Sequence, residues 1–171
     1  MAILAVILIS QIISGRCGAP YVPIRRELIK RLLAWGGLSP GDIIYDLGCG
    51  DARVLISAVK DFGAKRGIGY EISPWPYLKA GLMLRLAGLA DKIQIFRQDF
   101  FETNLRDANL VYTYIFPKLL DRLAFKMTEE LRPGTKILCP SFPINLTRHG
   151  QFKLLKTEKF DKITAYLYQK I

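Results

Sequence analysis

The chain has 171 residues, of which 50% are hydrophobic and 23% are charged. This length is enough for one domain with a single buried core, and the composition is that of a globular protein, which excludes intrinsic disorder. The 25 Lys and Arg residues outnumber the 15 Asp and Glu residues, and the net charge of +10 predicts attraction to nucleic acid, anionic lipid or acidic protein without distinguishing among them.

The cysteines and the histidine form no pattern typical of a metal site. Cys17, Cys49 and Cys139 are far apart in the sequence, and none belongs to a Cys-x-x-Cys pair. With only one histidine in the chain, zinc ligands are too few. We expect no metal ion, and we expect reduced thiols in a cytoplasmic protein.

Residues 2–13 are almost purely apolar. As a helix, the first fifteen residues would span only about 22 Å, short of a hydrocarbon core of about 30 Å. No basic segment precedes them, as a secretory signal would require. Three interpretations stay open for residues 1–15: a short membrane anchor, an interfacial helix or an additional core helix. The cations from Arg16 to Arg31 would keep an anchored domain of residues 16–171 in the cytoplasm and would favour anionic headgroups.

The first predicted elements lead from an extended connector to a buried strand. Residues 18–23 hold two prolines, each of which restricts its own backbone and that of its predecessor. Residues 24–35 have the apolar spacing of an amphipathic helix. Residues 43–47 are predicted to form a buried strand, and apolar residues recur at helical spacing in 54–59. A strand, a glycine turn and a helix in this order bring backbone N–H groups close to a ligand.

The turn between that strand and helix reads Asp46-Leu-Gly48-Cys-Gly50-Asp-Ala52. Gly48 and Gly50 lack Cβ, so the backbone can turn sharply there and let a cofactor lie against it. A dinucleotide fingerprint would require a third glycine where this chain has Arg53. Asp46 at the strand end would repel a pyrophosphate and attract a cationic ligand. The motif resembles motif I of the class I S-adenosylmethionine (SAM) methyltransferases.

The remainder of the chain alternates strands with helices. Strands are predicted at 67–71, 93–96, 110–115 and 136–139, helices at 76–87 and 118–131, and a closing hairpin with alternating exposure at 152–158 and 163–168. This alternation predicts an α/β fold with a mostly parallel sheet and helices on both faces. The resemblance to motif I implies that this fold is the Rossmann-like class I methyltransferase architecture, with seven strands and a C-terminal antiparallel hairpin.

Acidic residues follow the next two predicted strands as well. Glu71 lies 21 residues after Gly50, a position from which a carboxylate can accept hydrogen bonds from both ribose hydroxyls. Asp99 follows the third strand, where it could accept from the adenine amino group while Phe100 lies near the ring. Acids after three successive strands fit SAM better than they fit NAD.

Three segments together narrow the resemblance to one small family. They read Pro-Tyr-Val-Pro at 20–23, Asp-Leu-Gly-Cys-Gly-Asp-Ala-Arg at 46–53 and Gly-Tyr-Glu-Ile-Ser-Pro-Trp at 69–75. This combination is similar to the single-domain protein-lysine methyltransferases of archaea and bacteria. It is also similar to the membrane-anchored mitochondrial enzymes that methylate the ATP synthase c-subunit and the adenine nucleotide translocase. Further likeness at 114–117, 131–135 and 141–143 extends the resemblance over about residues 18–170.

The resemblance implies the cofactor and its contacts. SAM contacts are implied for Tyr21, Val22, Asp46, Gly48, Gly50, Glu71, Asp99 and Phe100. Two positions depart from the family pattern: Ala52 stands where a third glycine is usual, and Ile24 stands where a threonine is common, so that a hydroxyl contact is lost. The motifs identify no catalytic base.

The reaction that the resemblance implies is methyl transfer from SAM to a lysine side-chain amine of a protein. The amine must lose its proton first, and a desolvated channel beside the cationic sulfonium would lower its pKa from about 10.4. Aromatic walls could also hold a partly methylated ammonium by cation–π attraction. The aromatic residues proposed for this channel are Tyr112, Tyr114, Phe116 and Phe142.

The absence of an inserted substrate domain favours a large partner that brings its own shape. The positive charge favours an acidic protein, or one embedded in a membrane beside anionic lipid. An RNA methyltransferase is the alternative, but nucleic acid is disfavoured because residues 114–117 read Tyr-Ile-Phe-Pro rather than an Asn-Pro-Pro-Tyr-type motif for a flipped base. A non-catalytic SAM-binding protein is disfavoured because all three acids and both glycines are present.

Overall fold

The computed structural model describes residues 22–171. Its helices and strands follow one another in the order α2 (Arg26–Trp35), β1 (Ile43–Leu47), α3 (Arg53–Phe62), β2 (Arg66–Tyr70), α4 (Pro74–Ala87), β3 (Ile93–Phe96), η1 (Phe100–Glu102, a 3-10 helix), β4 (Leu110–Thr113), α5 (Pro117–Glu130), β5 (Lys136–Pro140), β6 (Phe152–Phe160) and β7 (Ile163–Lys170). Helices thus alternate with strands up to β5, and a hairpin closes the chain.

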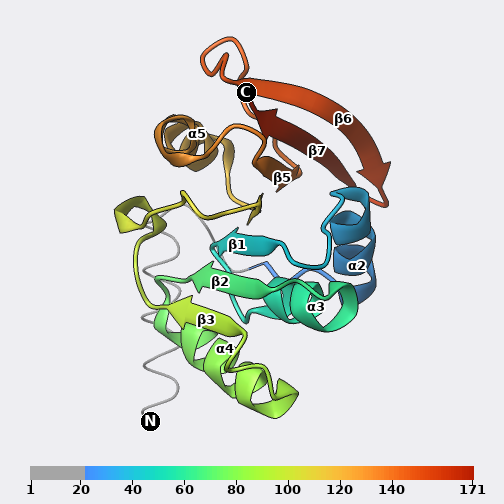
Figure 1. The fold of residues 1–171 in the computed structure, drawn as a ribbon, viewed down its shortest axis with the longest axis vertical. Helices are drawn as coiled ribbons and strands as arrows, with labels where there is room; N and C mark the ends of the chain where they lie inside the picture. The colour runs from blue at the N-terminus through green and yellow to red at the C-terminus, as the bar shows by residue number, and fades with distance from the viewer. Residues whose placement is uncertain (1–21) are drawn as a thin grey trace.

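All seven strands belong to one sheet, in the order β3-β2-β1-β4-β5-β7-β6. Strands β3 to β5 along this order pair in parallel, whereas β7 pairs antiparallel with both β5 and β6. The predicted fold is therefore confirmed. Figure 1 shows β1, β2 and β3 pointing in the same direction, so that their carboxyl ends lie on the same side of the sheet. The chain order reverses between β1 and β4, and ligands of open α/β sheets bind at such a point.

Local sequence accounts for where the helices begin and end. Pro74 and Pro117 are the first residues of α4 and α5, where the missing proline N–H has no helical partner to lose. Gly63 and Gly88 end α3 and α4 in the left-handed conformation, which costs a residue without Cβ little. Each helix therefore begins and ends at a defined residue between the carboxyl end of one parallel strand and the amino end of the next.

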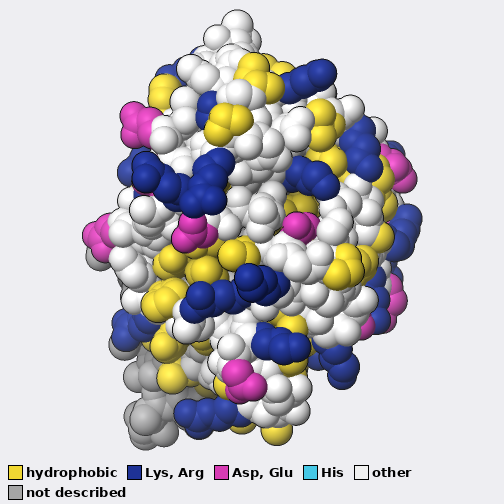
Figure 2. All heavy atoms as spheres, viewed as in Figure 1, with side chains coloured by type: hydrophobic (Ala, Val, Ile, Leu, Met, Phe, Trp, Pro, Cys, Tyr) yellow, Lys and Arg dark blue, Asp and Glu magenta, His cyan; other side chains and the backbone are white. Residues whose placement is uncertain are grey.

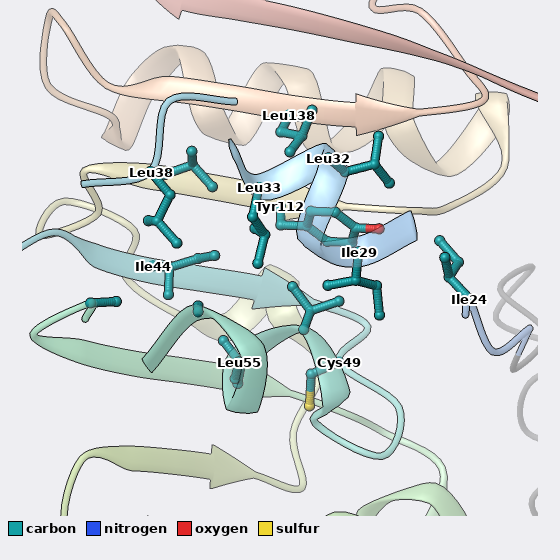
Figure 3. Close-up of a cluster of buried hydrophobic side chains, with 14 of the residues drawn as sticks. Ile24, Ile29, Leu32, Leu33, Leu38, Ile44, Cys49, Leu55, Tyr112 and Leu138 are labelled. Atoms are coloured by element: carbon teal, nitrogen blue, oxygen red, sulfur yellow. The ribbon is translucent and has the colours of Figure 1, made fainter. Parts of the chain in front are cut away.

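The two faces of the sheet carry two separate hydrophobic clusters. On one face, Leu32 of α2 and Leu55 of α3 pack with Ile44 of β1 (Figure 3). On the other face, Leu123 and Met127 of α5 belong to the second cluster. Helices thus cover both faces, as the alternation of apolar strands and helices predicts.

Several predicted boundaries are wrong by one or two residues, and one predicted exposure pattern is wrong. Strand β2 ends at Tyr70, so that Glu71 lies just after it. The first helix begins at Arg26 rather than residue 24, because Arg25 is in an extended conformation. Strand β4 ends at Thr113, so Tyr114 and the residues after it lie in the loop before α5. In β6, residues 153–159 are all exposed instead of alternating, because only the first and last residues of this outer strand, Phe152 and Phe160, pack into the hydrophobic clusters.

The apolar segment predicted at residues 2–13, and with it the division at residue 15, lies outside the described residues. Between Val22 and Ile171, no helix combines the length and the apolar character needed to cross a membrane. The anchor therefore stays a prediction.

Replacing Gly69 with valine is expected to lower the melting temperature by about 6–12 °C, the effect of about 3 kcal/mol of overpacking in a chain of this size. A Cβ atom at Gly69 in β2 would lie 2.7 Å from Cys49 Sγ and 2.8 Å from Leu55 Cδ1. Thermal denaturation of the two proteins measures the change. The control is Gly81→Ala in α4, where a Cβ meets nothing within 4 Å and the helix gains propensity. A valine variant as stable as the wild type would contradict this packing.

Candidate active site

The turn between β1 and α3 has an unusual backbone conformation. Gly48, Gly50 and Ala52 all have positive φ, of 89°, 54° and 61°. The backbone N–H groups of Gly48 and Cys49 donate to the carbonyl oxygen of Tyr70, at 2.9 and 3.0 Å, which ties the turn to the end of β2. Ala52 is a buried non-glycine residue in the left-handed region, a conformation that glycine would adopt at lower cost.

Glu71 closes this turn from the neighbouring strand. Its carboxylate oxygens accept hydrogen bonds from the backbone N–H of Gly50 at 3.0 Å and of Ser73 at 2.8 Å. Burial raises the pKa of the Glu71 carboxyl, and these two N–H groups oppose the rise. The carboxylate therefore holds the glycine turn and the start of α4 in a fixed relation to each other.

Asp46, on β1, lies beside the same turn and is only 3% exposed. Burial raises the pKa of the Asp46 carboxyl well above its usual value, and the negative charges of Glu71 and Asp51 raise it further. A buried carboxyl with this combination of neighbours is stabilised in its charged form by a cationic ligand. Asp46 is therefore suited to a positively charged group.

The loop after β3 supplies the third acid. Asp99 caps the short helix η1, and its Oδ1 accepts from the backbone N–H of Phe101 at 3.0 Å. The Phe100 ring is buried and lies 4.9 Å from that of Phe101, measured between centroids. The guanidinium of Arg122 lies over the Phe101 ring, 4.4 Å from its centroid. This loop thus presents a carboxylate next to aromatic surface.

A cavity of about 300 Å³ connects these groups. Its lining includes seven of the eight residues predicted to contact SAM, namely Val22, Asp46, Gly48, Gly50, Glu71, Asp99 and Phe100. The eighth, Tyr21, lies outside the described residues. Because the sheet order is β3-β2-β1-β4, the acids follow one another along the sheet edge in the order Asp99, Glu71, Asp46.

The four aromatic residues proposed for a substrate channel divide into two pairs. Tyr112 and Tyr114 line the cavity. Phe116 and Phe142 do not line it, but their rings pack together with centroids 5.9 Å apart, and Phe116 is 47% exposed. The structure therefore places two of the aromatics inside the cavity and two on a more exposed surface.

Sequence reasoning missed an ionic cluster beside the cavity. The buried carboxylate of Asp51 pairs with Arg53, with Oδ2 2.6 Å from Nη2, and with Lys79 Nζ at 3.1 Å. Arg53 Nη1 also donates to the carbonyl oxygen of Ile24 at 2.8 Å. This arginine links the segment before α2 to the glycine turn. The only sign of this role in the sequence is that Arg53 directly follows the glycine motif, which ends at Ala52.

The site fits the chemistry of SAM. The glycine turn offers a cradle in which backbone can approach a ligand, and acids at the ends of three parallel strands match an adenosine that carries a cationic end. The part of the chain from residue 22 onward contains no group of three or more His, Cys, Asp and Glu side chains arranged to hold a metal ion. This fold and this site define a class I SAM-dependent methyltransferase.

Comparison with known proteins narrows the class to a family. Residues 46–151 match the model of the ANTKMT methyltransferase domain. A protein-lysine N-methyltransferase of Saccharolobus islandicus is 34% identical over 73% of this chain and 78% of its own length. The chain belongs to this methyltransferase family, which confirms the resemblance found in the sequence.

Two further matches bear on cofactor and substrate. The adenine nucleotide translocase lysine N-methyltransferase of Mus musculus is 30% identical over 75% of this chain, which spans only 56% of that protein. A solved structure of an RNA methyltransferase from Salinibacter ruber, bound to S-adenosylhomocysteine, is 31% identical with a TM-score of 0.79, over 87% of this chain and 94% of that one. Together with the methyltransferase family, the bound S-adenosylhomocysteine identifies SAM as the cofactor.

Proposed function

We propose that this protein transfers a methyl group from SAM to a lysine side-chain amine of a protein substrate. The observation that carries the proposal is the single cavity that joins three acids, in sheet order, to the glycine turn and to two tyrosines. The relatives named for lysine methylation support the choice of acceptor.

Each part of the cofactor has a proposed partner in the cavity. Asp99 and Phe100 hold the adenine, Glu71 the ribose hydroxyls, and Asp46 the positively charged end. Gly48 and Gly50 let the backbone approach the ligand closely. Val22 lies at the cavity wall, and Tyr21, outside the described residues, is also proposed to contact SAM. The order of the acids along the sheet edge supports this assignment.

Bound SAM would supply the methyl group. A neutral amine would attack the methyl carbon in line, the N–C bond forming as the C–S bond breaks, with S-adenosylhomocysteine as the leaving group. The protein contributes alignment, which is worth several kcal/mol when the reacting atoms are held together. Tyr112 and Tyr114 exclude water from the cavity side of the amine, and desolvation favours its neutral form. Phe116 and Phe142 are proposed to guide the lysine side chain from the surface, with cation–π attraction for partly methylated forms.

The substrate is proposed to be an acidic or a membrane-embedded protein. No connection within residues 22–171 holds an inserted substrate domain. Figure 2 shows Lys and Arg side chains spread over the visible face with fewer Asp and Glu, in keeping with the net charge of +10. Such a surface attracts acidic protein and the anionic membrane surface that would surround an embedded target.

Residues 1–15 are proposed to attach the domain to a membrane, with the domain on the cytoplasmic side. The apolar run and the cations that follow it support this orientation. Cell fractionation of the full chain and of a chain lacking residues 1–15 tests the proposal. Recovery of the full chain in the soluble fraction would contradict it.

RNA methylation is the second candidate because the Salinibacter ruber relative carries that name. We rank it below lysine methylation because residues 114–117, directly after β4, lack an Asn-Pro-Pro-Tyr-type motif for a flipped base. The basic surface would serve phosphate binding equally well, so charge does not separate the two.

The test uses SAM with a radiolabelled methyl group and a cell extract divided into soluble protein, membrane protein and RNA. An Asp46→Ala, Glu71→Ala double variant is the control. Label that appears in a protein, is lost with the variant and is recovered as methyl-lysine after hydrolysis supports the proposal. Label in RNA alone would contradict the lysine acceptor and leave the fold and the cofactor standing.

The raised pKa of Asp46 predicts that affinity for S-adenosylhomocysteine, which keeps the ammonium, falls as pH falls. Protonation removes the charge that attracts the ligand, by up to about tenfold per pH unit below that pKa. The ligand-free protein responds in the opposite sense. A pKa raised on folding contributes stability that is complete below the unfolded value of about 3.9 and is lost as pH rises through the folded value.

Thermal denaturation with and without S-adenosylhomocysteine, from about pH 5 to pH 8, measures both trends. The Asp46→Asn variant is the matched control, because its side chain does not titrate. A ligand-induced stabilisation with the same pH dependence in the variant would contradict the role of Asp46.

A further inference from the structure

The hydroxyl group of Tyr112 is buried without a hydrogen-bond partner. The residue is 2% exposed, and among the described residues only one other buried side-chain polar atom, Thr128 Oγ1, lacks a partner. An unsatisfied buried hydroxyl costs stability, and buried polar groups in native proteins are nearly always paired. The Tyr112 hydroxyl, unlike Thr128, belongs to a residue that lines the cofactor cavity. A ligand in that cavity could satisfy it.

Strand register places Tyr112 beside Asp46. The two residues are partners in the parallel pairing of β1 with β4, so their side chains project from the same face of the sheet. Both line the cavity, and the negative charge of Asp46 contributes to the raised pKa of the Tyr112 hydroxyl, after the larger effect of burial. Figure 3 shows the Tyr112 ring among Ile29, Leu32 and Leu33, with its oxygen directed toward the side on which Ile24 lies.

Asp46 and Tyr112 form the end of the cavity farthest from Asp99 along the sheet order β3-β2-β1-β4. If adenine lies at Asp99 and ribose at Glu71, the aminoacyl end of SAM lies at Asp46 and Tyr112. That end carries an ammonium and a carboxylate. A carboxylate side chain complements the first, and a hydroxyl donor in an apolar wall complements the second.

We propose that the Tyr112 hydroxyl donates a hydrogen bond to the carboxylate of the aminoacyl end of SAM, while Asp46 faces its ammonium. The proposal rests on the cofactor assignment in the proposed function and does not depend on whether the methyl acceptor is protein or RNA. Tyr112 is thus a binding residue for the aminoacyl end of the cofactor. The Tyr112 ring still forms the inner wall next to Tyr114.

The test measures ligand affinity of the full chain and its Tyr112→Phe variant by calorimetry. The two ligands are S-adenosylhomocysteine, which keeps the carboxylate, and decarboxylated SAM, which lacks it and keeps the ammonium. We expect the variant to bind S-adenosylhomocysteine at least tenfold more weakly, as loss of a hydrogen bond to a charged group predicts, and to bind decarboxylated SAM within twofold of the wild type.

Tyr168→Phe is the matched control. Tyr168 is 1% exposed, but its hydroxyl accepts a hydrogen bond from the backbone N–H of Ile144 at 3.0 Å. Its replacement should lower the melting temperature of the ligand-free protein and leave both affinities unchanged. Tyr112→Phe should weaken the binding of S-adenosylhomocysteine alone, and it should not lower the melting temperature, since it removes an unsatisfied hydroxyl.

Equal losses of affinity for both ligands, or no loss for either, would overturn the proposal. A lower melting temperature of ligand-free Tyr112→Phe would also overturn it, because the hydroxyl would then have a partner within the protein. Failure of the wild type to bind S-adenosylhomocysteine is a separate outcome that would overturn the cofactor assignment itself.

Discussion

Replacing Glu71 with alanine is expected to weaken binding of S-adenosylhomocysteine by at least a hundredfold and to abolish methyl transfer at ordinary SAM concentrations. Two proposed ribose hydrogen bonds to a charged acceptor are lost, at about 1.5–3 kcal/mol each. The substitution also frees the backbone N–H groups of Gly50 and Ser73, which Glu71 now holds at 3.0 and 2.8 Å. The site therefore loses the proposed contacts to the ribose and also the hydrogen bonds that hold the glycine turn next to the start of α4.

Calorimetric titration of the variant measures the affinity. Because Glu71 also supports the turn, Glu71→Gln is measured alongside; it keeps the shape and one acceptor oxygen, so a smaller loss is expected. Glu102→Gln, an exposed acid on η1, is the charge-matched control and should bind like the wild type. An alanine variant that folds and binds within threefold of the wild type would remove Glu71 from the site.

The part of the site built by strand ends could be predicted from the sequence. Asp46 lies near the end of one short apolar run, and Glu71 and Asp99 follow two others. Each run is a strand of the parallel part of the sheet, and parallel strands bring such ends to one edge. Glycines at 48 and 50 mark the turn because few other residues adopt positive φ. Local pattern and fold topology together therefore determine these positions.

The part built by side-chain packing could not be predicted. From the sequence alone, the four aromatic residues proposed for the substrate channel could not be told apart by burial. In the structure Tyr112 is buried in β4, whereas Phe116 is half exposed in the loop that follows. The contact from Arg53 to the Ile24 carbonyl joins residues 29 positions apart. The burial of an aromatic side chain and a contact between distant residues both depend on where β4 ends and on what each side chain packs against. Tertiary packing decides these features, and local periodicity does not.

Tyr114 differs from the other aromatics in joining the cavity to the loop that leads to the surface. It lines the cavity, is half-buried, and directly follows the end of β4 at Thr113. We propose that a lysine side chain passes its ring on the way from the Phe116–Phe142 pair to the methyl donor. If the ring is lost, water enters, the amine stays protonated, and its alignment with the methyl group relaxes.

Tyr114→Ala is accordingly expected to lower kcat/KM for lysine methylation by about a hundredfold, which corresponds to about 2.7 kcal/mol of lost transition-state stabilisation. Affinity for S-adenosylhomocysteine should stay within about threefold, since the acids proposed to hold the cofactor are untouched. Phe125→Ala, an aromatic of α5 that does not line the cavity, is the control and should retain activity. The rate should partly recover at high pH, where more of the lysine amine is neutral. An equal loss of cofactor affinity and rate would instead assign Tyr114 to the cofactor, and the lysine would then have to reach the methyl group by another path.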